Sequence, residues 1–256
     1  MKKFIIQKMF YISIFIILKL QAYSSEPIHV RADYWCPYNC SPSDINQGYM
    51  IEILQKAFGE ENIKYETMNW ARAVTETREG GFDAIVGAAK EDAPDFIFSD
   101  ILGKSQNCYY TFGKKVFKYT GIDSLKSIRV GIVKDYSYYE ELNTYIKNNL
   151  ADKTKIDETF GDYVLEKMIG KARNGEIDAF VEDPNVVNFY LKKHYDIKEL
   201  KNSGCSPLEN VYIAFSPKKK NSEERVEILN KTIKKMIKNG EMKKLLKKYS
   251  IPIWFK

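Results

Sequence analysis

Histidine is nearly absent from this sequence, which has only His29 and His194 among 256 residues. His29 falls inside an alternating strand pattern and His194 at the lysine-flanked end of a helical stretch, so we expect both to be structural. No histidine and no second cysteine pair stands at the spacing of a zinc site. The sequence also shows no pairing of a nucleophile with a base. We therefore expect no metal, no cofactor and no enzymatic activity.

Long apolar runs are absent after residue 25, so no later segment matches a membrane span of about 20 residues. The first 25 residues are organised like a secretory signal peptide. Lys2, Lys3 and Lys8 form its basic start, residues 9–18 its apolar run, and residues 22–25 offer small side chains for cleavage. No cysteine stands at the cleavage site, so we expect no lipid anchor. The sequence predicts a periplasmic protein from which residues 1–25 are removed.

A large excess of positive charge is absent once this segment is set aside. The net charge of the whole sequence is +6, and loss of Lys2, Lys3, Lys8 and Lys19 leaves 6 − 4 = +2. A nearly neutral chain gives no reason to expect nucleic acid as a partner. We interpret the lysines of the two C-terminal helical stretches as solvent-exposed faces.

Cysteine is scarce, and its four copies in an exported chain indicate disulfides. Four cysteines allow three connectivities, which the sequence leaves open. We favour Cys36 with Cys40, which closes a short turn, and Cys108 with Cys205, which would tie residues 107–112 to the segment before a later strand. In the chain-entropy model so long a loop contributes roughly 4 to 5 kcal/mol of stability.

An internal repeat organises the rest of the chain. Residues 78–88 and 173–183 share one pattern, in which an amphipathic stretch ends at a glycine and Asp83 or Asp178 then opens a short apolar run. This is the pattern of a helix, a glycine stop and a strand buried on both faces, as in a parallel sheet. We expect both aspartates to be structural. The chain therefore predicts two similar α/β lobes.

A ligand cleft is expected between the lobes, because ligands of open parallel sheets lie beyond the carboxyl ends of the strands. This places residues 87–90 of one lobe near Glu182 and Asp183 of the other. Ser137 and Glu140 form a capping box, so we expect a helix to begin at Ser137 with free N–H groups facing the cleft. Further strands are expected over residues 28–32, 63–67, 107–113, 128–133, 155–159 and 211–215. Further helices are expected over residues 48–58, 69–78, 162–173, 184–193, 222–238 and 241–248.

Several stretches, in their order along the chain, resemble the solute-binding proteins of family 3, which include the amino-acid receptors of ABC transporters. These stretches are residues 33–38, 48–52, 70–73, 80–88, 119–125 and 211–216. The resemblance implies a type II periplasmic binding protein-like fold, with two α/β lobes joined by two crossing strands. It divides the chain into a signal peptide (1–25), a discontinuous first lobe (26–112 and 211–256) and a second lobe (113–210).

The sequence departs from this family at one position that matters. Amino-acid receptors of the family carry an arginine shortly after the strand that matches residues 83–87, where it grips the α-carboxylate of the ligand, and residues 88–93 contain none. Lys90 or Arg72 could replace it, although lysine lacks the planar two-point grip of guanidinium. Glu182 and Asp183 stand where the family receives an ammonium group. We therefore expect a small polar ligand, with its cationic end there and its anionic end near Arg72 and the predicted helix start.

Aromatic side chains accompany these groups at strand ends and helix starts. Flat rings there could wall a ligand or hold a cation, although packing is an equally good explanation for each of them. Arg72 could instead pair with Glu76 one turn on, and Asp183 could cap the helix that follows it. The expected ligand-binding set is Asp33, Tyr34, Trp35, Tyr38, Trp70, Arg72, Ala88, Lys90, Tyr136, Ser137, Tyr138, Glu182 and Asp183.

Two classes of function fit these features. The first is a monomeric binding protein that closes on its ligand and presents it to the membrane permease of an ABC transporter. The second is an enzyme on the same scaffold, similar to the dehydratases that act on cyclic acids (cyclohexadienyl dehydratase), with Glu182 as the one credible general acid. A third possibility is a ligand-sensing partner of a membrane receptor.

Overall fold

The computed structural model describes residues 26–161 and 163–256 of the chain. The expected signal peptide, residues 1–25, lies outside the described residues, and so does Asp162, where we expected a helix to begin. No helix among the described residues has the length and apolar character that crossing a membrane requires.

The described strands join one mixed sheet in the order β2-β1-β3-β9-β5-β8-β6-β7, with β4 paired to β9. Their bounds are β1 Ile28–Ala32, β2 Ile63–Thr67, β3 Ala84–Ala88, β4 Ile97–Phe98, β5 Gly103–Phe112, β6 Val130–Val133, β7 Ile156–Thr159, β8 Ala179–Glu182 and β9 Leu200–Phe215. Strands β1, β2 and β3 pair in parallel, and so do β6, β7 and β8. The sheet thus contains two similar parallel units, one on each side of β5 and β9.

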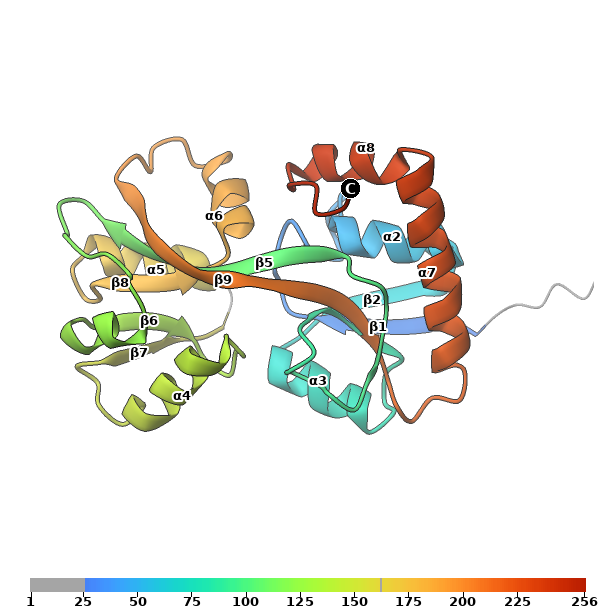
Figure 1. Cartoon of the computed structure of the whole chain (residues 1–256), viewed down its shortest axis with the longest axis horizontal. Coiled ribbons are helices and arrows are strands. Elements are labelled where there is room, and N and C mark those ends of the chain that lie inside the picture. The colour runs from blue at the N-terminus through green and yellow to red at the C-terminus, as the bar shows by residue number, and fades with distance from the viewer. Residues whose placement is uncertain (1–25, 162) are drawn as a thin grey trace, which may run out of the picture.

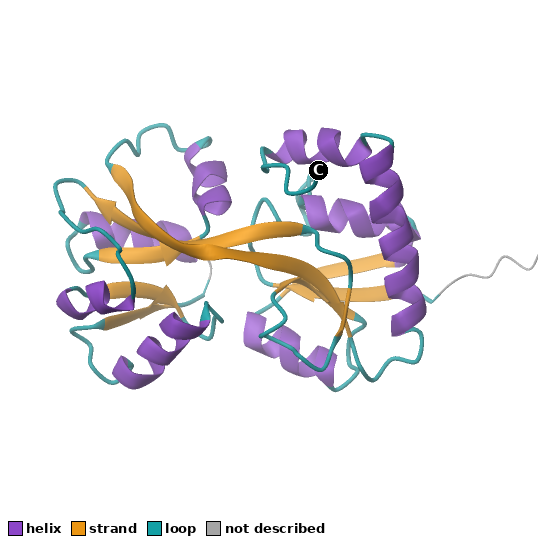
Figure 2. Cartoon of the chain, viewed as in Figure 1, coloured by secondary structure: helices purple, strands orange, loops and turns teal. Residues whose placement is uncertain are grey.

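Helices flank these strands and complete two α/β lobes (Figures 1 and 2). One lobe carries α2, α3, α7 and α8 and the other carries α4, α5 and α6 (Figure 1). The bounds are α2 Tyr49–Phe58, α3 Trp70–Arg78, α4 Glu140–Asn149, α5 Val164–Arg173, α6 Pro184–Leu191, α7 Ser222–Lys238 and α8 Glu241–Tyr249, with 3-10 turns η2 Glu60–Asn62 and η3 Ile122–Ser127. The predicted two-lobed α/β class is confirmed. The division of the chain at residues 112 and 210 stays a prediction.

The connection between the lobes is a pair of long strands, β5 and β9, that run side by side across the molecule (Figure 1). They pair antiparallel from Gly103 opposite Val211 to Phe112 opposite Leu200. Both are longer than we predicted, because β5 begins at residue 103 and β9 at residue 200. The added residues are mostly polar and include Gly204 and Pro207, so no apolar alternation marks them as a strand. Pairing with the partner strand extends them.

The two copies of the repeat perform the same task in their lobes. The backbone N–H of Asp83 donates to the carbonyl of His29 at 2.9 Å, and its carboxylate accepts the N–H of His29 at 2.7 Å. Asp178 makes the same two bonds to Arg129, at 2.9 and 2.7 Å. Each aspartate therefore clamps the start of the third strand of its lobe to the first, which confirms the structural role expected for both.

The four cysteines form the disulfides Cys36–Cys40 and Cys108–Cys205, so the connectivity that we favoured is confirmed. The first closes the loop that follows β1. The second joins β5 to β9 within the pair of connecting strands, where Cys108 and Cys205 stand opposite each other. A covalent bond therefore fixes the register of the two strands on which the lobes are mounted.

Candidate functional site

A cavity of about 290 Å³ lies between the lobes and takes its walls from both of them. From the first lobe come the loop after β1, the loop after β3 and the start of α3, and from the second come the residues around β6, the start of α4 and the end of β8. Both connecting strands also line it. The expected site residues that line this cavity are Asp33, Trp35, Trp70, Tyr136, Ser137, Tyr138, Glu182 and Asp183.

The other expected site residues lie elsewhere. Tyr34 is exposed on the surface, whereas Tyr38 and Ala88 are fully buried in the core behind the cavity. Arg72 is 66% exposed and pairs with Glu76, the alternative that we considered for it. Lys90 places its ammonium 5.6 Å from the centre of the Tyr212 ring. Neither candidate for the missing arginine lines the cavity.

The loop after β1 contacts the other lobe directly. Trp35 and Tyr38 stack with ring centroids 4.0 Å apart, inside the turn that the Cys36–Cys40 disulfide closes. The Trp35 indole N–H donates to Glu182 Oε1 at 3.3 Å, and the Tyr38 hydroxyl donates to Asp183 Oδ1 at 3.2 Å. Two aromatic side chains of the first lobe thus hold the two carboxylates of the second, and the lobes are closed on each other in this structure.

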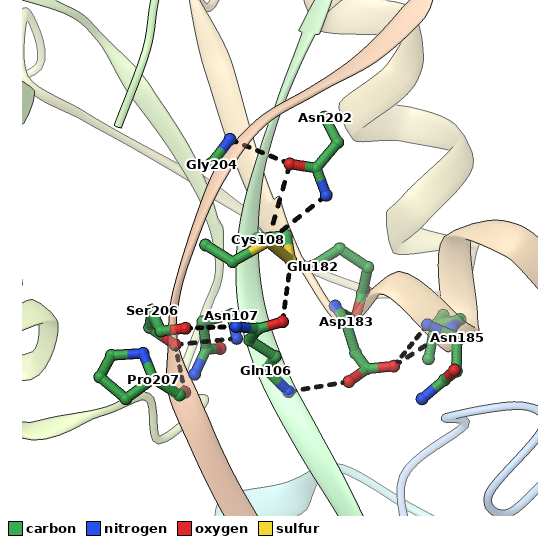
Figure 3. Close-up of a disulfide and its surroundings, with 12 residues drawn as sticks. Gln106, Asn107, Cys108, Glu182, Asp183, Asn185, Asn202, Gly204, Ser206 and Pro207 are labelled. Carbon is green, nitrogen blue, oxygen red and sulfur yellow. Dashed lines mark hydrogen bonds between the residues drawn. A yellow bond between two sulfur atoms is a disulfide. The ribbon is translucent and has the colours of Figure 1, made fainter. Parts of the chain in front are cut away.

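Asp183 is hydrogen-bonded through both carboxylate oxygens. Its Oδ1 caps α6 by accepting the N–H groups of Asn185 at 2.7 Å and Val186 at 3.3 Å, as the capping alternative predicted. Its Oδ2 accepts the N–H of Gln106 at 3.0 Å, close to the Cys108–Cys205 disulfide (Figure 3). Burial raises the pKa of Asp183 to about 6, against the opposing effect of these bonds. Asp183 therefore links the cavity floor, α6 and the connecting strand β5.

Glu182 keeps more bonding capacity than Asp183. Only 8% exposed, it accepts the Trp35 indole and the backbone N–H of Asp183 through Oε1, while no described group donates to Oε2. Burial raises its pKa to about 8, and the charges of Asp183 and Asp33 act in the same direction. Burial likewise raises the pKa of Asp33 to about 7. At neutral pH Glu182 therefore favours the protonated state, and Asp33 is close to the midpoint of its titration.

The predicted helix start at Ser137 is wrong. Helix α4 begins at Glu140 with Tyr139 as its N-cap, and no side chain caps it. The preceding residues stay extended because the Tyr138 hydroxyl accepts the Val133 N–H at 2.8 Å and the Asn143 side chain accepts the N–H of Tyr138 at 2.9 Å. Ser137 still lines the cavity. The first turn of α4 carries Glu140 and Glu141, so its free N–H groups face acidic side chains of their own helix.

Sequence reasoning missed several acidic groups of the site. Glu91, Asp92, Glu140 and Glu209 also line the cavity. Burial raises the pKa of Asp92, whereas hydrogen bonds from the Ser137 hydroxyl and the Ala89 N–H act to lower it. The first two follow β3, in the stretch where we looked for an arginine. Glu209 lies in the part of β9 that has no strand pattern, so no local signal identified it.

The charge of the lining is therefore one-sided. Among the described residues, the side chains that line the cavity include no lysine, arginine or histidine. The seven acidic ones are Asp33, Glu91, Asp92, Glu140, Glu182, Asp183 and Glu209. Four aromatic residues, Trp35, Trp70, Tyr136 and Tyr138, also line the cavity.

The raised pKa values predict that the ligand-free protein loses stability as pH rises. The pKa values of Asp33, Glu182 and Asp183 rise from 3.8, 4.5 and 3.8 to about 7, 8 and 6, so the folded state binds more protons than the unfolded chain. The stabilisation is complete below about pH 4 and is lost as pH rises through 6 to 8. Thermal unfolding should show the melting temperature falling by roughly 3 °C or more between pH 5 and pH 8.

Glu182→Gln separates this effect from the general charge of the protein. Glutamine can still accept the Trp35 and Asp183 N–H groups but cannot ionise, so the decline near pH 8 should become shallower. Glu227→Gln removes the same charge from the exposed face of α7, where the side chain is 72% exposed, and should leave the slope unchanged. A melting temperature that rose steadily between pH 5 and pH 8 would contradict the prediction.

The family model described as bacterial extracellular solute-binding proteins, family 3, matches residues 28–252. No curated protein matches the sequence. An ancestral arginine-binding protein bound to arginine superposes with a TM-score of 0.69 at 19% identity, over 87% of this chain and 97% of that one. The substrate-binding protein of an amino-acid ABC transporter superposes with a TM-score of 0.64 at 18% identity, over 87% of this chain and 98% of that one. A histidine kinase sensor domain with similarity to periplasmic binding proteins superposes with a TM-score of 0.68 at 14% identity, over 87% of this chain and 95% of that one. At sequence identities this low, the comparison with solved structures shows only that the fold is shared.

Proposed function

Because the chain belongs to family 3 of the bacterial extracellular solute-binding proteins, we propose that it captures a small polar solute between its lobes and presents it to a membrane transporter. The transporter is proposed by analogy with the amino-acid ABC transporter whose substrate-binding protein shares the fold. The signal-like segment of residues 1–25 supports a site of action outside the cytoplasm.

The observation that carries this proposal is a cavity whose walls come from both lobes and from the two strands that connect them. A solute inside it touches both lobes at once, so it stabilises the closed arrangement relative to an open one. The cavity lies near the lower end of the range of ligand pockets, about 300 to 1,000 Å³, which suits a solute of amino-acid size. The closed form is then the surface that a membrane partner recognises.

Thermal unfolding against a panel of amino acids, polyamines, organic acids and short peptides tests the proposal. A ligand at 100 times its Kd adds about 2.7 kcal/mol of stability, which for a chain of this size raises the melting temperature by roughly 5 to 10 °C. Ser137→Trp should abolish the shift by placing a large ring in the cavity lining. Ser127→Trp, at an exposed position outside the lining, is the matched control. A shift that persisted in Ser137→Trp would place the ligand elsewhere.

An enzyme on this scaffold is the second candidate, favoured by one observation. Burial raises the pKa of Glu182 to about 8, so this carboxyl is protonated at neutral pH, as a general acid must be. An acidic cavity, however, opposes binding of the cyclic carboxylic acids on which the dehydratases of this scaffold act. Mass spectrometry of a bound ligand after incubation distinguishes the candidates. Turnover that Glu182→Gln abolishes while binding persists would establish the enzyme.

A further inference from the structure

A zwitterionic ligand finds no cationic side chain among the described lining residues to receive its carboxylate. Arg72 is turned outward to Glu76, and Lys90 lies against Tyr212. The start of α4, which we had expected to hold the anionic end, presents Glu140 to the cavity instead. The only charged side chains that an α-carboxylate would meet in the described lining are acidic, and like charges brought together in a partly desolvated site repel strongly. The neutral donors of the lining, such as Ser137, Asn107 and Asn143, bring no compensating positive charge.

Six of the seven acidic side chains form two groups on different elements, and the seventh, Glu140, lies in the first turn of α4. The first, at the carboxyl ends of β1 and β8, consists of Asp33, Glu182 and Asp183. The second lies on the loop after β3 and on β9, and consists of Glu91, Asp92 and Glu209. Burial raises the pKa of Glu209, and the charges of Glu91 and Asp92 add to the effect. Each group can neutralise one positive charge of a ligand that spans the cavity.

Glu182 supplies the most specific acceptor. It is 92% buried (100 − 8), it lines the cavity, and no described group donates a hydrogen bond to its Oε2. A buried carboxylate without a charged or hydrogen-bonding partner is costly, and a donor with positive charge removes that cost. Trp35, whose indole holds the other oxygen, fixes the carboxylate in place. A cationic N–H group in the cavity would both donate to Oε2 and stabilise the ionised form of Glu182.

The remaining wall also favours an organic cation. The faces of Trp and Tyr rings attract ammonium and guanidinium groups, and Trp35, Trp70, Tyr136 and Tyr138 line the cavity. Among the described residues no set of three or more histidine, cysteine, aspartate or glutamate side chains is arranged to hold a metal ion.

We propose that the solute is a small organic dication without a carboxylate. Glu182 and Asp33 hold one of its cationic nitrogen groups, and the second acidic group, which contains Glu209, holds the other. This inference rests on the proposed function, because it assigns the ligand class of the same cavity. It departs from the amino-acid ligands that the resemblance implied, since no residue of the lining replaces the arginine that those ligands require.

Matched pairs of compounds that differ only by the α-carboxylate test the proposal. Isothermal titration at pH 8 compares agmatine with arginine and cadaverine with lysine. We expect each amine to bind and the corresponding amino acid to bind at least about 100-fold more weakly, because its carboxylate faces like charges. Pentylamine, which carries one cationic group, should bind at least about tenfold more weakly than cadaverine.

Charge-removing variants identify the two acidic groups. Glu182→Gln and Glu209→Gln should each weaken binding of the better amine by about tenfold or more, because each loses a charge-assisted hydrogen bond. Glu227→Gln on α7 should have no effect. Binding should also release protons, since the cation favours the ionised carboxylates, and titration in buffers of different ionisation enthalpy measures that release.

The outcomes separate this inference from the proposed function. Arginine or lysine binding as tightly as its decarboxylated partner would overturn the dication, while capture of a solute in the cavity would stand. An acidic ligand, or no binding by any of the amines, would overturn it as well. Amine binding that Glu182→Gln, Glu209→Gln and Ser137→Trp all leave unchanged would place the ligand outside the cavity and overturn both.

Discussion

Replacing Cys108 and Cys205 together by alanine should lower the free energy of unfolding by about 4 to 5 kcal/mol in the chain-entropy model. The disulfide closes a loop with a sequence separation of 97 residues, which contains the elements of the second lobe from β6 to α6. Without it the unfolded chain gains the conformational freedom of that loop. Urea denaturation followed by far-UV circular dichroism, on the oxidised protein and the variant, measures the difference.

The Cys36–Cys40 disulfide offers a matched control, because the same number of sulfurs is removed from a far shorter loop. Its sequence separation is 4 residues, and the same model gives a loss of about 2 kcal/mol for Cys36→Ala with Cys40→Ala. Equal losses in the two double variants would show that loop length does not determine the effect. The Cys36–Cys40 double variant should also loosen the Trp35 contact with Glu182. Its ligand affinity should therefore fall, even though its loss of unfolding free energy is the smaller of the two.

Asp83→Asn should cost about 3 to 5 kcal/mol of stability, because it breaks a buried ion pair. Asp83 and Arg225 join at 2.6 Å with side chains 6% and 8% exposed, and Lys219 lies 3.8 Å from the same carboxylate. Asparagine can still accept the His29 N–H, so the strand clamp survives. What is lost is the one acidic partner that the buried guanidinium of Arg225 has among the described residues. Thermal and urea unfolding of the variant measure the cost.

The second copy of the repeat supplies the control for this prediction. Asp178 clamps its strand in the same way, but its partner Lys115 is 43% exposed and Asp178 itself 28%. A solvent-exposed pair contributes only about 0 to 1 kcal/mol, so Asp178→Asn should be nearly neutral. Asp83→Asn combined with Arg225→Met should recover much of the lost stability, because no unpaired buried charge remains. A double variant as unstable as Asp83→Asn alone would assign the loss to the clamp instead.

Most elements of the two lobes could be predicted from local pattern. Helix α7 has the predicted bounds, Ser222–Lys238, and β1, β2 and α2 lie within a residue of theirs. These segments bury an apolar face against a sheet, and such burial leaves a periodicity of 3.6 or 2 residues in the sequence. The repeat revealed the third strand of each lobe, because Asp83 and Asp178 perform the same local task.

The site was predictable only where its residues follow strand ends. Asp33, Trp35, Glu182 and Asp183 were found in this way, since the carboxyl ends of parallel strands meet at one edge. Glu209 was not, because it lies in a polar stretch that becomes a strand only through pairing with β5. Arg72 was expected in the site, but its guanidinium pairs instead with Glu76, one helical turn further along α3.

The sequence by itself determined the fold class and the duplicated lobes, because both depend on short-range pattern, and it limited the four cysteines to three possible connectivities. Only the tertiary structure decided the length of the connecting strands, the start of α4 and the charge of the cavity. These depend on contacts that leave no periodic pattern in the sequence. Examples are the side-chain hydrogen bonds that join Tyr138 to Val133 and Asn143, each five residues away, and the pairing of β5 with β9, whose cysteines Cys108 and Cys205 are 97 residues apart. Whether a carboxylate belongs to the site depends on which residues surround it in the folded protein, and the pattern of residues along the sequence does not contain that information.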